Sequence, residues 1–248
     1  MVYIKNQEEI ELIRKSSRLA SQSLDYAASK IKPGMTTRAL DKLIHDFIVS
    51  HKGIPASLNY NGFPGSSCIS VNDEVCHGIP GKRVIQEGDI VKVDVTTCLD
   101  GYFGDTCRTF KVGKVSQDAE KLVDATYEAT MLAIATVREG SRVGDIGHAI
   151  QSHVEPLGFS VVRYFEGHGV GRELHEDPPI PHYGEKGTGF KIKLGMVFTI
   201  EPMINSGDYL VAILDDNWTA VTADGSLSAH FEHTLALTPK GVEILTVS

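Results

Sequence analysis

The sequence predicts an α/β (α+β) fold built from two related halves, each made of two helices followed by antiparallel strands, around a central cleft. Helix-like and strand-like segments occur in the order helix, helix, strands, and this order repeats after about residue 115. The segments Glu87–Asp94 and Leu194–Glu201 align without gaps, and each carries a carboxylate six positions after a glycine. No linker rich in Pro, Ser or charge separates the halves, so we expect a single domain over residues 1–248, with an internal repeat of roughly 1–115 and 116–248.

Composition is that of a soluble globular protein. The chain has 248 residues, of which 42% are hydrophobic and 23% charged, and no stretch of about 18 uncharged apolar residues. Its first residues lack the apolar segment of a secretory signal. The formal net charge of -8 argues against a broad surface for nucleic acids or anionic membranes. We therefore expect a cytoplasmic monomer without DNA or membrane partners.

Two amphipathic helices open the first half. Asn6 followed by Glu9 is a capping-box pattern, and apolar residues then recur at three- and four-residue steps until Pro33–Gly34 ends the helix. A second helix with its own apolar stripe is expected over about residues 37–53. Both helices are therefore expected to cover a core.

A β-hairpin follows over Gly88–Arg108. Its first strand is rich in Val and Thr, and Asp100–Gly101 supplies the turn before a second strand returns. The turn is expected to bring Asp94 on the outgoing strand close to Asp105 on the returning strand. Two carboxylates at that range repel each other unless a cation lies between them.

The second half repeats this plan. Ser116 begins a third helix, which is expected to end near Gly140, and a fourth helix runs from about Val143 to Pro156–Gly158. The glycine-rich stretch 167–175 then leads to the second pair of acid-bearing strands.

Four carboxylates and one imidazole form the candidate metal centre. Glu201 occupies the place of Asp94 in the aligned segments, and Glu232 lies on an apolar strand as Asp105 does. For any one of them the ordinary alternative is a surface carboxylate, but four acids at matching places on apolar strands would leave unpaired charge in a core. With His168 they form a set suited to two divalent ions, Co, Mn, Fe or Zn. Two such ions about 3.5 to 4 Å apart share and activate a water molecule, and symmetry favours one bridging acid from each half.

Histidines precede these strands in both halves. Glycines on both sides of His168 leave it without enclosing neighbours, which favours a metal ligand over a packed core residue. His77 and His175 lie upstream of acid strands; as neutral donors at the cleft rim they can stabilise a developing oxyanion, with a surface role as the equal alternative. His233 is expected on the strand face opposite Glu232. Structural or solvated roles are expected for His45, His51, His148, His153 and His182.

Five apolar or aromatic residues lie near these motifs. Taken singly, each is expected in a core. A specificity pocket beside the metals needs such a lining, however. The five are Tyr60, Phe63, Cys68, Leu174 and Trp218.

A set of motifs also carries a family resemblance. They are Val75–Pro80 around His77, the pair Asp94 and Asp105, Gly167–His175, Phe198–Met203 around Glu201, and Phe231–Thr234 around Glu232. Together they resemble type I methionine aminopeptidase, in the short bacterial form of peptidase family M24, over nearly the whole chain. The resemblance implies a pita-bread fold with two pseudo-twofold-related halves around a di-metal cleft. It also implies removal of the initiator methionine from nascent proteins when the second residue is small.

The resemblance assigns the metal ligands. Asp105 and Glu232 are implied to bridge the two ions, His168 and Glu201 to complete one site, and Asp94 to chelate the other. The second ion would hold the free amine of the substrate, which makes the enzyme an exopeptidase. The activated bridging water or hydroxide would attack the scissile carbonyl, with Glu201 as a proton acceptor.

The resemblance also assigns the substrate-binding residues. His77 and His175 are implied to bind the substrate and stabilise the tetrahedral intermediate. Leu174 stands where an aromatic residue is usual in the methionine pocket, and Ser57 where Cys is common. The loop 207–217 lacks the basic residues of some bacterial members, which leaves ribosome association open.

Two other interpretations of the function remain. A proline-specific aminopeptidase or prolidase has the same fold, but those enzymes carry an additional N-terminal domain. A non-catalytic binding module would keep the fold without the chemistry. The presence of all five ligand positions argues against the binding module.

Overall fold

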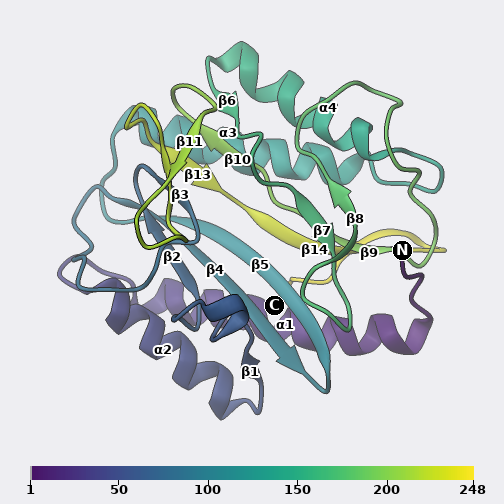
Figure 1. Cartoon of the computed structure of the whole chain (residues 1–248), viewed down its shortest axis with the longest axis horizontal. Coiled ribbons are helices and arrows are strands. Elements are labelled where there is room, and N and C mark those ends of the chain that lie inside the picture. The colour runs from purple at the N-terminus through teal and green to yellow at the C-terminus, as the bar shows by residue number, and fades with distance from the viewer. Residues whose placement is uncertain (1) are drawn as a thin grey trace.

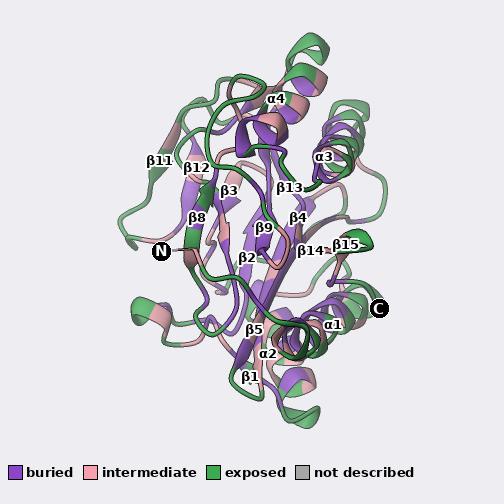
Figure 2. Ribbon diagram, turned by 90° about the vertical axis from the view of Figure 1, so that its right-hand side faces the viewer, coloured by how far each residue is buried: buried purple, intermediate pink, exposed green. Residues whose placement is uncertain are grey.

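The computed structural model describes residues 2–248 as a curled sheet with four helices packed on one side (Figure 1). Seen from the side in Figure 2, two of the helices lie to the right of the sheet and one lies above it, whereas strands β8 (Glu176–Ile180), β11 (Val211–Ile213) and β12 (Ala220–Thr222) lie to the left. The helices are α1 (Gln7–Lys30), α2 (Thr37–Ser50), α3 (Gln117–Ala135) and α4 (Val143–Val154), with short 3-10 turns at Tyr60–Gly62 and Glu155–Leu157.

The strands follow the helices in each half. In the first half they are β1 (Ile54–Pro55), β2 (Cys68–Val71), β3 (Glu74–Cys76), β4 (Ile90–Leu99) and β5 (Tyr102–Lys111). In the second half they are β6 (Ser160–Val161), β7 (Gly167–Gly169), β8 (Glu176–Ile180), β9 (Val197–Ile200), β10 (Met203–Asn205), β11 (Val211–Ile213), β12 (Ala220–Thr222), β13 (Ser228–His230), β14 (Glu232–Thr238) and β15 (Gly241–Ile244). The predicted order of helix, helix, strands in each half is confirmed.

One antiparallel sheet of nine strands runs through both halves. Its order is β1-β4-β5-β14-β9-β7-β8, with β2 paired to β4 and β15 paired to β14. Strand β14 joins the halves, because it pairs with β5 on one side and with β9 on the other. Two small sheets, β13-β10-β6 and β11-β12-β3, complete the strands.

The helix termini follow the local sequence. The Asn6 side chain accepts a hydrogen bond from the Glu9 N–H, and the Glu9 carboxylate accepts one from the Asn6 N–H, so the predicted capping box is present. The third helix ends at Ala135, not near Gly140 as predicted. The Thr136 hydroxyl donates to a carbonyl of the last turn, that of Ala133, which stops the helix earlier.

Each half packs its helices on its own apolar cluster. Leu24 of α1 and Ile44 of α2 pack against Val93 of β4. In the second half, α3 and α4 pack against β9 and β14, with Ile146 and Phe198 fully buried there. The helices of each half thus share an apolar core with the sheet. Within residues 2–248 no helix combines the length and apolar character that a membrane crossing requires.

Candidate metal centre

The five candidate ligands lie on neighbouring strands of the large sheet. Asp94 is on β4, Asp105 on β5, Glu232 on β14 and His168 on β7, and Glu201 immediately follows β9. The strand order β4-β5-β14-β9-β7 therefore places one candidate ligand on, or directly after, each of five adjacent strands. The sequence prediction that both halves aim acids at one place agrees with this arrangement.

The hairpin register fixes the relation between the two first-half acids. Asp94 lies opposite Cys107, and Asp105 lies opposite Thr96, so the carboxylates are diagonal neighbours on one face rather than directly opposed. Cys107 in turn lies opposite Glu232 of β14. Side chains of paired residues share a face, so Asp94 and Glu232 point to the same side of the sheet.

The ligand atoms converge on a small volume. His168 Nε2 is 3.7 Å from Asp105 Oδ2 and 3.5 Å from Glu201 Oε1. One ligand atom each from Asp105, His168 and Glu232 lies within 4.8 Å of the others. These separations suit groups that share a cation.

His168 is held in one tautomer. Its Nδ1 lies 2.9 Å from the Gly169 carbonyl, to which it donates, so Nε2 carries a lone pair. Burial lowers the pKa of His168 to about 3, which keeps the ring neutral at pH 7. A neutral ring whose far nitrogen is fixed by a carbonyl is the usual arrangement of a metal-ligating histidine.

The glycines beside His168 are required by close packing. A Cβ on Gly167 would lie 2.6 Å from the Thr199 carbonyl oxygen, and one on Gly169 would lie 2.3 Å from the Asp177 carbonyl oxygen. The flanking glycines thus let β7 lie against β8 and β9. This explains the Gly-His-Gly pattern that marked His168 in the sequence.

The four carboxylates are enclosed by protein. Asp105 is 5% exposed and Glu232 2% exposed, while Glu201 is also buried and Asp94 is partly exposed. Burial raises the pKa of all four carboxyls, that of Asp105 to about 7, and repulsion by neighbouring carboxylates adds to the effect at Asp94, Glu201 and Glu232. Within residues 2–248 no Lys or Arg forms an ion pair with any of them.

This donor set fits divalent metal ions. A histidine lone pair and carboxylate oxygens face one another, and this arrangement is stable only with protons or cations between them. Carboxylates with a single imidazole suit hard or borderline divalent metals.

Three residues that the sequence did not reveal support the ligands. Thr96 Oγ1 donates to Asp105 Oδ1 at 2.8 Å, and Thr199 Oγ1 donates to Glu201 Oε1 at 2.6 Å. His182 Nε2 accepts the backbone N–H of Glu201 at 3.1 Å. Such partners orient ligands and tune a metal site.

All twelve predicted site residues line one cavity of about 240 Å³. Besides the five ligands, its wall contains His77, His175, Tyr60, Phe63, Cys68, Leu174 and Trp218. Phe63 and Trp218 pack edge to face with ring centres 5.2 Å apart. The wall also includes Thr96 and Asn61, which were not predicted, and Ser57, which had been noted only for its position. The cavity therefore joins the donor set to an apolar and aromatic pocket.

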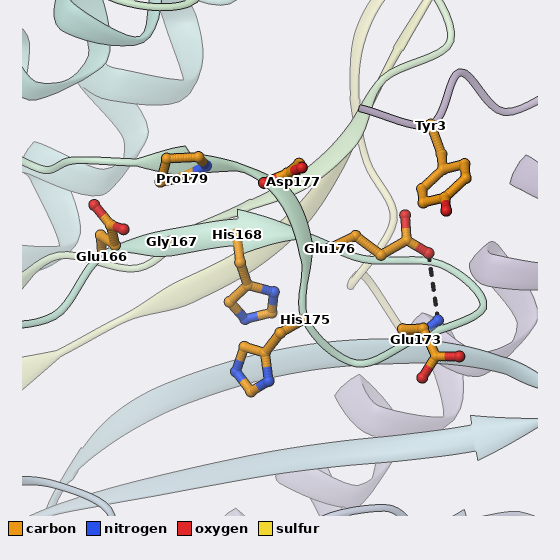
Figure 3. A pocket seen from close by; sticks show the side chains of 9 residues that line it. All are labelled: Tyr3, Glu166, Gly167, His168, Glu173, His175, Glu176, Asp177 and Pro179. Carbon is orange, nitrogen blue, oxygen red and sulfur yellow. Dashed lines mark hydrogen bonds between the residues drawn. The ribbon is translucent and has the colours of Figure 1, made fainter. Parts of the chain in front are cut away.

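Two further histidines lie at the cavity. The His175 ring centre is 4.2 Å from that of His168, and Figure 3 shows both rings projecting from the β7–β8 segment. Tyr60 Oη lies 2.6 Å from His175 Nδ1. His77 has a φ of +56°, a left-handed conformation that is uncommon outside glycine. Burial lowers the pKa of His77 to about 4, with a smaller contribution from His175.

Three other histidines, His233, His182 and His230, are buried or partly buried near these strands. His233 is turned away from the ligands and bonds Thr246 Oγ1 at 2.8 Å, as expected for the opposite face. His182, expected to be structural or solvated, is buried against Glu201. His230 was not considered in the sequence; it is buried, and neither ring nitrogen has a hydrogen-bond partner among residues 2–248.

An open pocket of about 610 Å³ adjoins the cavity and shares His168 and His175 with it (Figure 3). Four carboxylates also line this pocket, those of Glu166, Glu173, Glu176 and Asp177, and Glu176 forms a buried ion pair with Lys5. The pair ties the start of the chain to β8 beside the candidate centre.

Comparison with known proteins identifies the family. The family model described as "Metallopeptidase family M24" matches residues 11–239. The chain belongs to metallopeptidase family M24. Within M24 it is 53% identical to methionine aminopeptidase A of Synechocystis sp. over 247 residues, which cover 99% of this chain and 98% of that protein. It groups with the methionine aminopeptidases, and is thus an enzyme of the hydrolase class.

Solved M24 structures show the same fold. The crystal structure of methionine aminopeptidase from Rickettsia prowazekii superposes with a TM-score of 0.98 at 48% identity, covering 100% of both chains. The pita-bread fold expected from the motifs is confirmed. A prolidase from Pyrococcus furiosus shares the fold alone, with a TM-score of 0.78 at 24% identity, and the match covers 99% of this chain and 65% of that one.

Proposed function

We propose that this M24 enzyme removes the initiator methionine from nascent proteins when the second residue is small. The observation that carries the proposal is the single cavity in which five metal-donor residues meet an apolar and aromatic wall. The high identity to proteins named methionine aminopeptidase supports the same activity. We further propose that residues 1–248 act as one catalytic domain, as a cytoplasmic monomer.

The metal sites follow from the donor set. Asp105 and Glu232 are proposed to contact both of two divalent ions, with His168 and Glu201 completing one site and Asp94 the other. The ions, Co, Mn, Fe or Zn, would polarise the scissile carbonyl and activate the attacking water. Thr96 and Thr199 hold the carboxylates Asp105 and Glu201 in place, so the protein presents both in fixed orientations.

The chain's own residues then act on the substrate. Asp94, only partly exposed, lies at the end of the donor row, where the substrate's free amine is proposed to bind. Glu201 is proposed to accept the proton of the attacking water, because its buried carboxylate lies among the donors, 3.5 Å from His168 Nε2. His77 and His175 are proposed to donate hydrogen bonds to the substrate and the tetrahedral intermediate.

The side chain of the first residue is proposed to lie in the apolar part of the cavity. Tyr60, Phe63, Cys68, Leu174 and Trp218 line that part. An unbranched thioether makes favourable contacts with such aromatic rings and fills an irregular pocket well. Leu174 is buried here, so the side chain in the position of the usual aromatic residue still contributes apolar surface.

Ribosome association is a separate matter. The loop 207–217 carries three aspartates and neither Lys nor Arg. Nucleic-acid phosphates are bound through basic residues, so this loop gives no support to docking on ribosomal RNA.

The proposal is tested with metal-free protein to which Mn, Fe, Co or Zn is added singly. Met-Ala-Ser should be cleaved to Met and Ala-Ser with at least one metal, while Met-Trp-Ser and Leu-Ala-Ser are cleaved much more slowly. Preferential cleavage of Ala-Pro would instead indicate a proline-specific peptidase. Tight binding of Met-Ala-Ser without cleavage under any metal would indicate a binding module.

A further inference from the structure

Exposed apolar side chains gather on two segments beside the candidate site. The first segment, 163–165, immediately precedes the strand of His168, and its Tyr164 is 70% exposed. The second segment forms β11 and its flanks, where Leu210 is 52% exposed. We call the following residues the exit surface: Tyr164, Tyr209, Leu210, Ile213 and Leu214, all exposed.

Ring contacts connect the first segment to the cavity. The His77 ring, in the cavity wall, packs edge to face on Phe165 at 5.2 Å between ring centres. Phe165 packs in the same way on Tyr164 at 5.0 Å. These two ring-to-ring distances together equal the length of about three residues of extended chain. Tyr164 is therefore within reach of a peptide that leaves the cavity past His77.

The second segment is tied both to the first and to the cavity. The Arg163 guanidinium lies over the Tyr209 ring at 4.3 Å from its centre. At the other end of the β11–β12 hairpin, Trp218 lines the cavity. Asp216 Oδ1 accepts the N–H groups of Trp218 and Thr219 at 2.9 and 2.8 Å, which fixes that end. The hairpin thus meets the cavity at its turn and leaves β11 outside.

β11 is the edge strand of its sheet, whose order is β11-β12-β3, and Figure 2 shows it at the margin of the molecule. Leu214 N–H donates to Thr219 O, and Leu210 O accepts from Ala223 N–H, so alternate residues of β11 face β12. The backbone N–H and C=O groups of Val211 and Ile213 point the other way. An extended peptide can pair with such an edge.

The charges of this surface select a peptide over a nucleic acid. The charged residues of loop 207–217 are Asp208, Asp215 and Asp216, which repel phosphate. The apolar side chains between them offer contact area to apolar side chains of a partner.

We propose that the exit surface binds the fourth and following residues of the substrate polypeptide, and that it favours apolar or aromatic side chains there. The substrate main chain pairs with the free edge of β11, and its side chains contact Tyr164 and Leu210. The proposal rests on the proposed aminopeptidase function, and it adds a preference for sequence beyond the third residue. Its occupant is the substrate itself because the surface is continuous with the cavity wall.

The test compares three substrates: Met-Ala-Ser, Met-Ala-Ser-Phe-Leu-Val and Met-Ala-Ser-Gly-Ser-Gly. The wild type should cleave the apolar hexapeptide with kcat/KM about tenfold above the Gly-Ser hexapeptide, mainly through KM. Tyr164→Ala and Leu210→Ala should each reduce that advantage about fivefold, the factor for about 1 kcal/mol of apolar contact. Hydrolysis of Met-Ala-Ser should be unchanged in both variants, since the tripeptide ends before the exit surface.

A matched control and a backbone probe sharpen the test. Leu157→Ala removes a leucine of similar exposure, 55% against 52% for Leu210, on the helical side of the molecule, and should leave all three substrates unaffected. The apolar hexapeptide N-methylated at its fourth residue cannot pair fully with β11 and should lose most of its advantage.

Three results would overturn the proposal. One is equal kcat/KM for the two hexapeptides in the wild type. Another is an apolar advantage that persists in both Tyr164→Ala and Leu210→Ala. The third is a wild-type dimer in solution that Leu210→Asp dissociates, which would assign the surface to a second copy of this chain. Absence of any Met-Ala-Ser cleavage would instead contradict the proposed function.

Discussion

The two halves of the molecule hold their metal-directed acids by different means. In the first half, Asp94 and Asp105 lie inside a hairpin of ten consecutive residue pairs, from Ile90 opposite Lys111 to Leu99 opposite Tyr102. In the second half, the β9–β14 ladder has four pairs, and Glu201 lies beyond its last residue. A long strand ladder fixes the direction of every side chain along it. A residue past the end of a short ladder needs other support.

That support comes from side chains. Glu201 receives a hydrogen bond from Thr199, and its backbone N–H is bound by His182. The Thr199 hydroxyl also accepts a hydrogen bond from the backbone N–H of His168 at 3.0 Å, so one hydroxyl connects two candidate ligands. The comparison teaches that backbone register directs Asp94 and Asp105, whereas Glu201, past the end of its ladder, depends on side-chain hydrogen bonds.

The largest effect is expected on substitution of Asp105 or Glu232, and the two variants should lose similar amounts of activity. Asp105→Asn and Glu232→Gln each remove one carboxylate that both ions are proposed to share. Each variant should lose more activity on Met-Ala-Ser than the roughly 10- to 100-fold expected for an outer partner, and should bind less metal. Steady-state kinetics and elemental analysis measure these effects. Asp100→Asn, in the exposed hairpin turn, serves as the control. Normal turnover in one variant alone would show that only one half supplies a shared ligand.

Substitution of the supporting threonines should lower metal affinity by different amounts in the two halves. Thr199→Val should weaken metal binding by about 10- to 100-fold, the usual range for an outer-shell partner. Thr96→Val should have a smaller effect, because the hairpin register still directs Asp105. Competition with a chelator gives both dissociation constants. Equal losses in the two variants would mean that register does not hold the first-half acids.

Metal binding should depend on pH through the acids rather than through His168. Burial raises the pKa of Asp105 to about 7 and lowers that of His168 to about 3. At pH 6 a metal must therefore displace the Asp105 proton, whereas the imidazole is already free. The apparent affinity should rise about tenfold from pH 6 to pH 8 through Asp105 alone. Titrations in weak buffer should show protons released at pH 6. A flat affinity without proton release would contradict this.

The smallest effect is expected at His182. His182→Leu leaves the Glu201 N–H without an acceptor, at a cost of about 1–3 kcal/mol. Each kcal/mol lowers Tm by roughly 2–4 °C in a chain of this size. His182→Gln keeps an acceptor and should recover part of the loss, both in Tm and in kcat. Thermal unfolding of the two variants side by side checks this, and equal Tm values for both would remove His182 from the supporting network.

The sequence predicted the parts of this molecule that depend on local signals. The Asn6 capping box, the Asp100–Gly101 turn and the Gly-His168-Gly pattern each act within a few residues, and each is present. The convergence of Asp94 and Glu201 on one cavity could be predicted because the aligned halves marked equivalent positions for them.

The hydrogen bonds that support the candidate ligands join residues that are distant in the sequence, and these could not be predicted. His182 is 19 residues from Glu201, and no sequence pattern links them. Thr234 bonds the backbone of Asp105 from 129 residues away. The diagonal relation of Asp94 and Asp105, by contrast, follows from the local turn, because the two-residue loop Asp100–Gly101 places Leu99 opposite Tyr102 and so sets the register of the hairpin.

The position of β14 between β5 and β9 has a consequence for the order of events during synthesis. The first-half acids leave the ribosome early, but Glu232 belongs to one of the last strands, and that strand joins the two halves. A growing chain that has displayed only its N-terminal hairpin holds two of the five donors. We therefore expect cation uptake to be a late step of maturation, one that follows assembly of the sheet instead of guiding it.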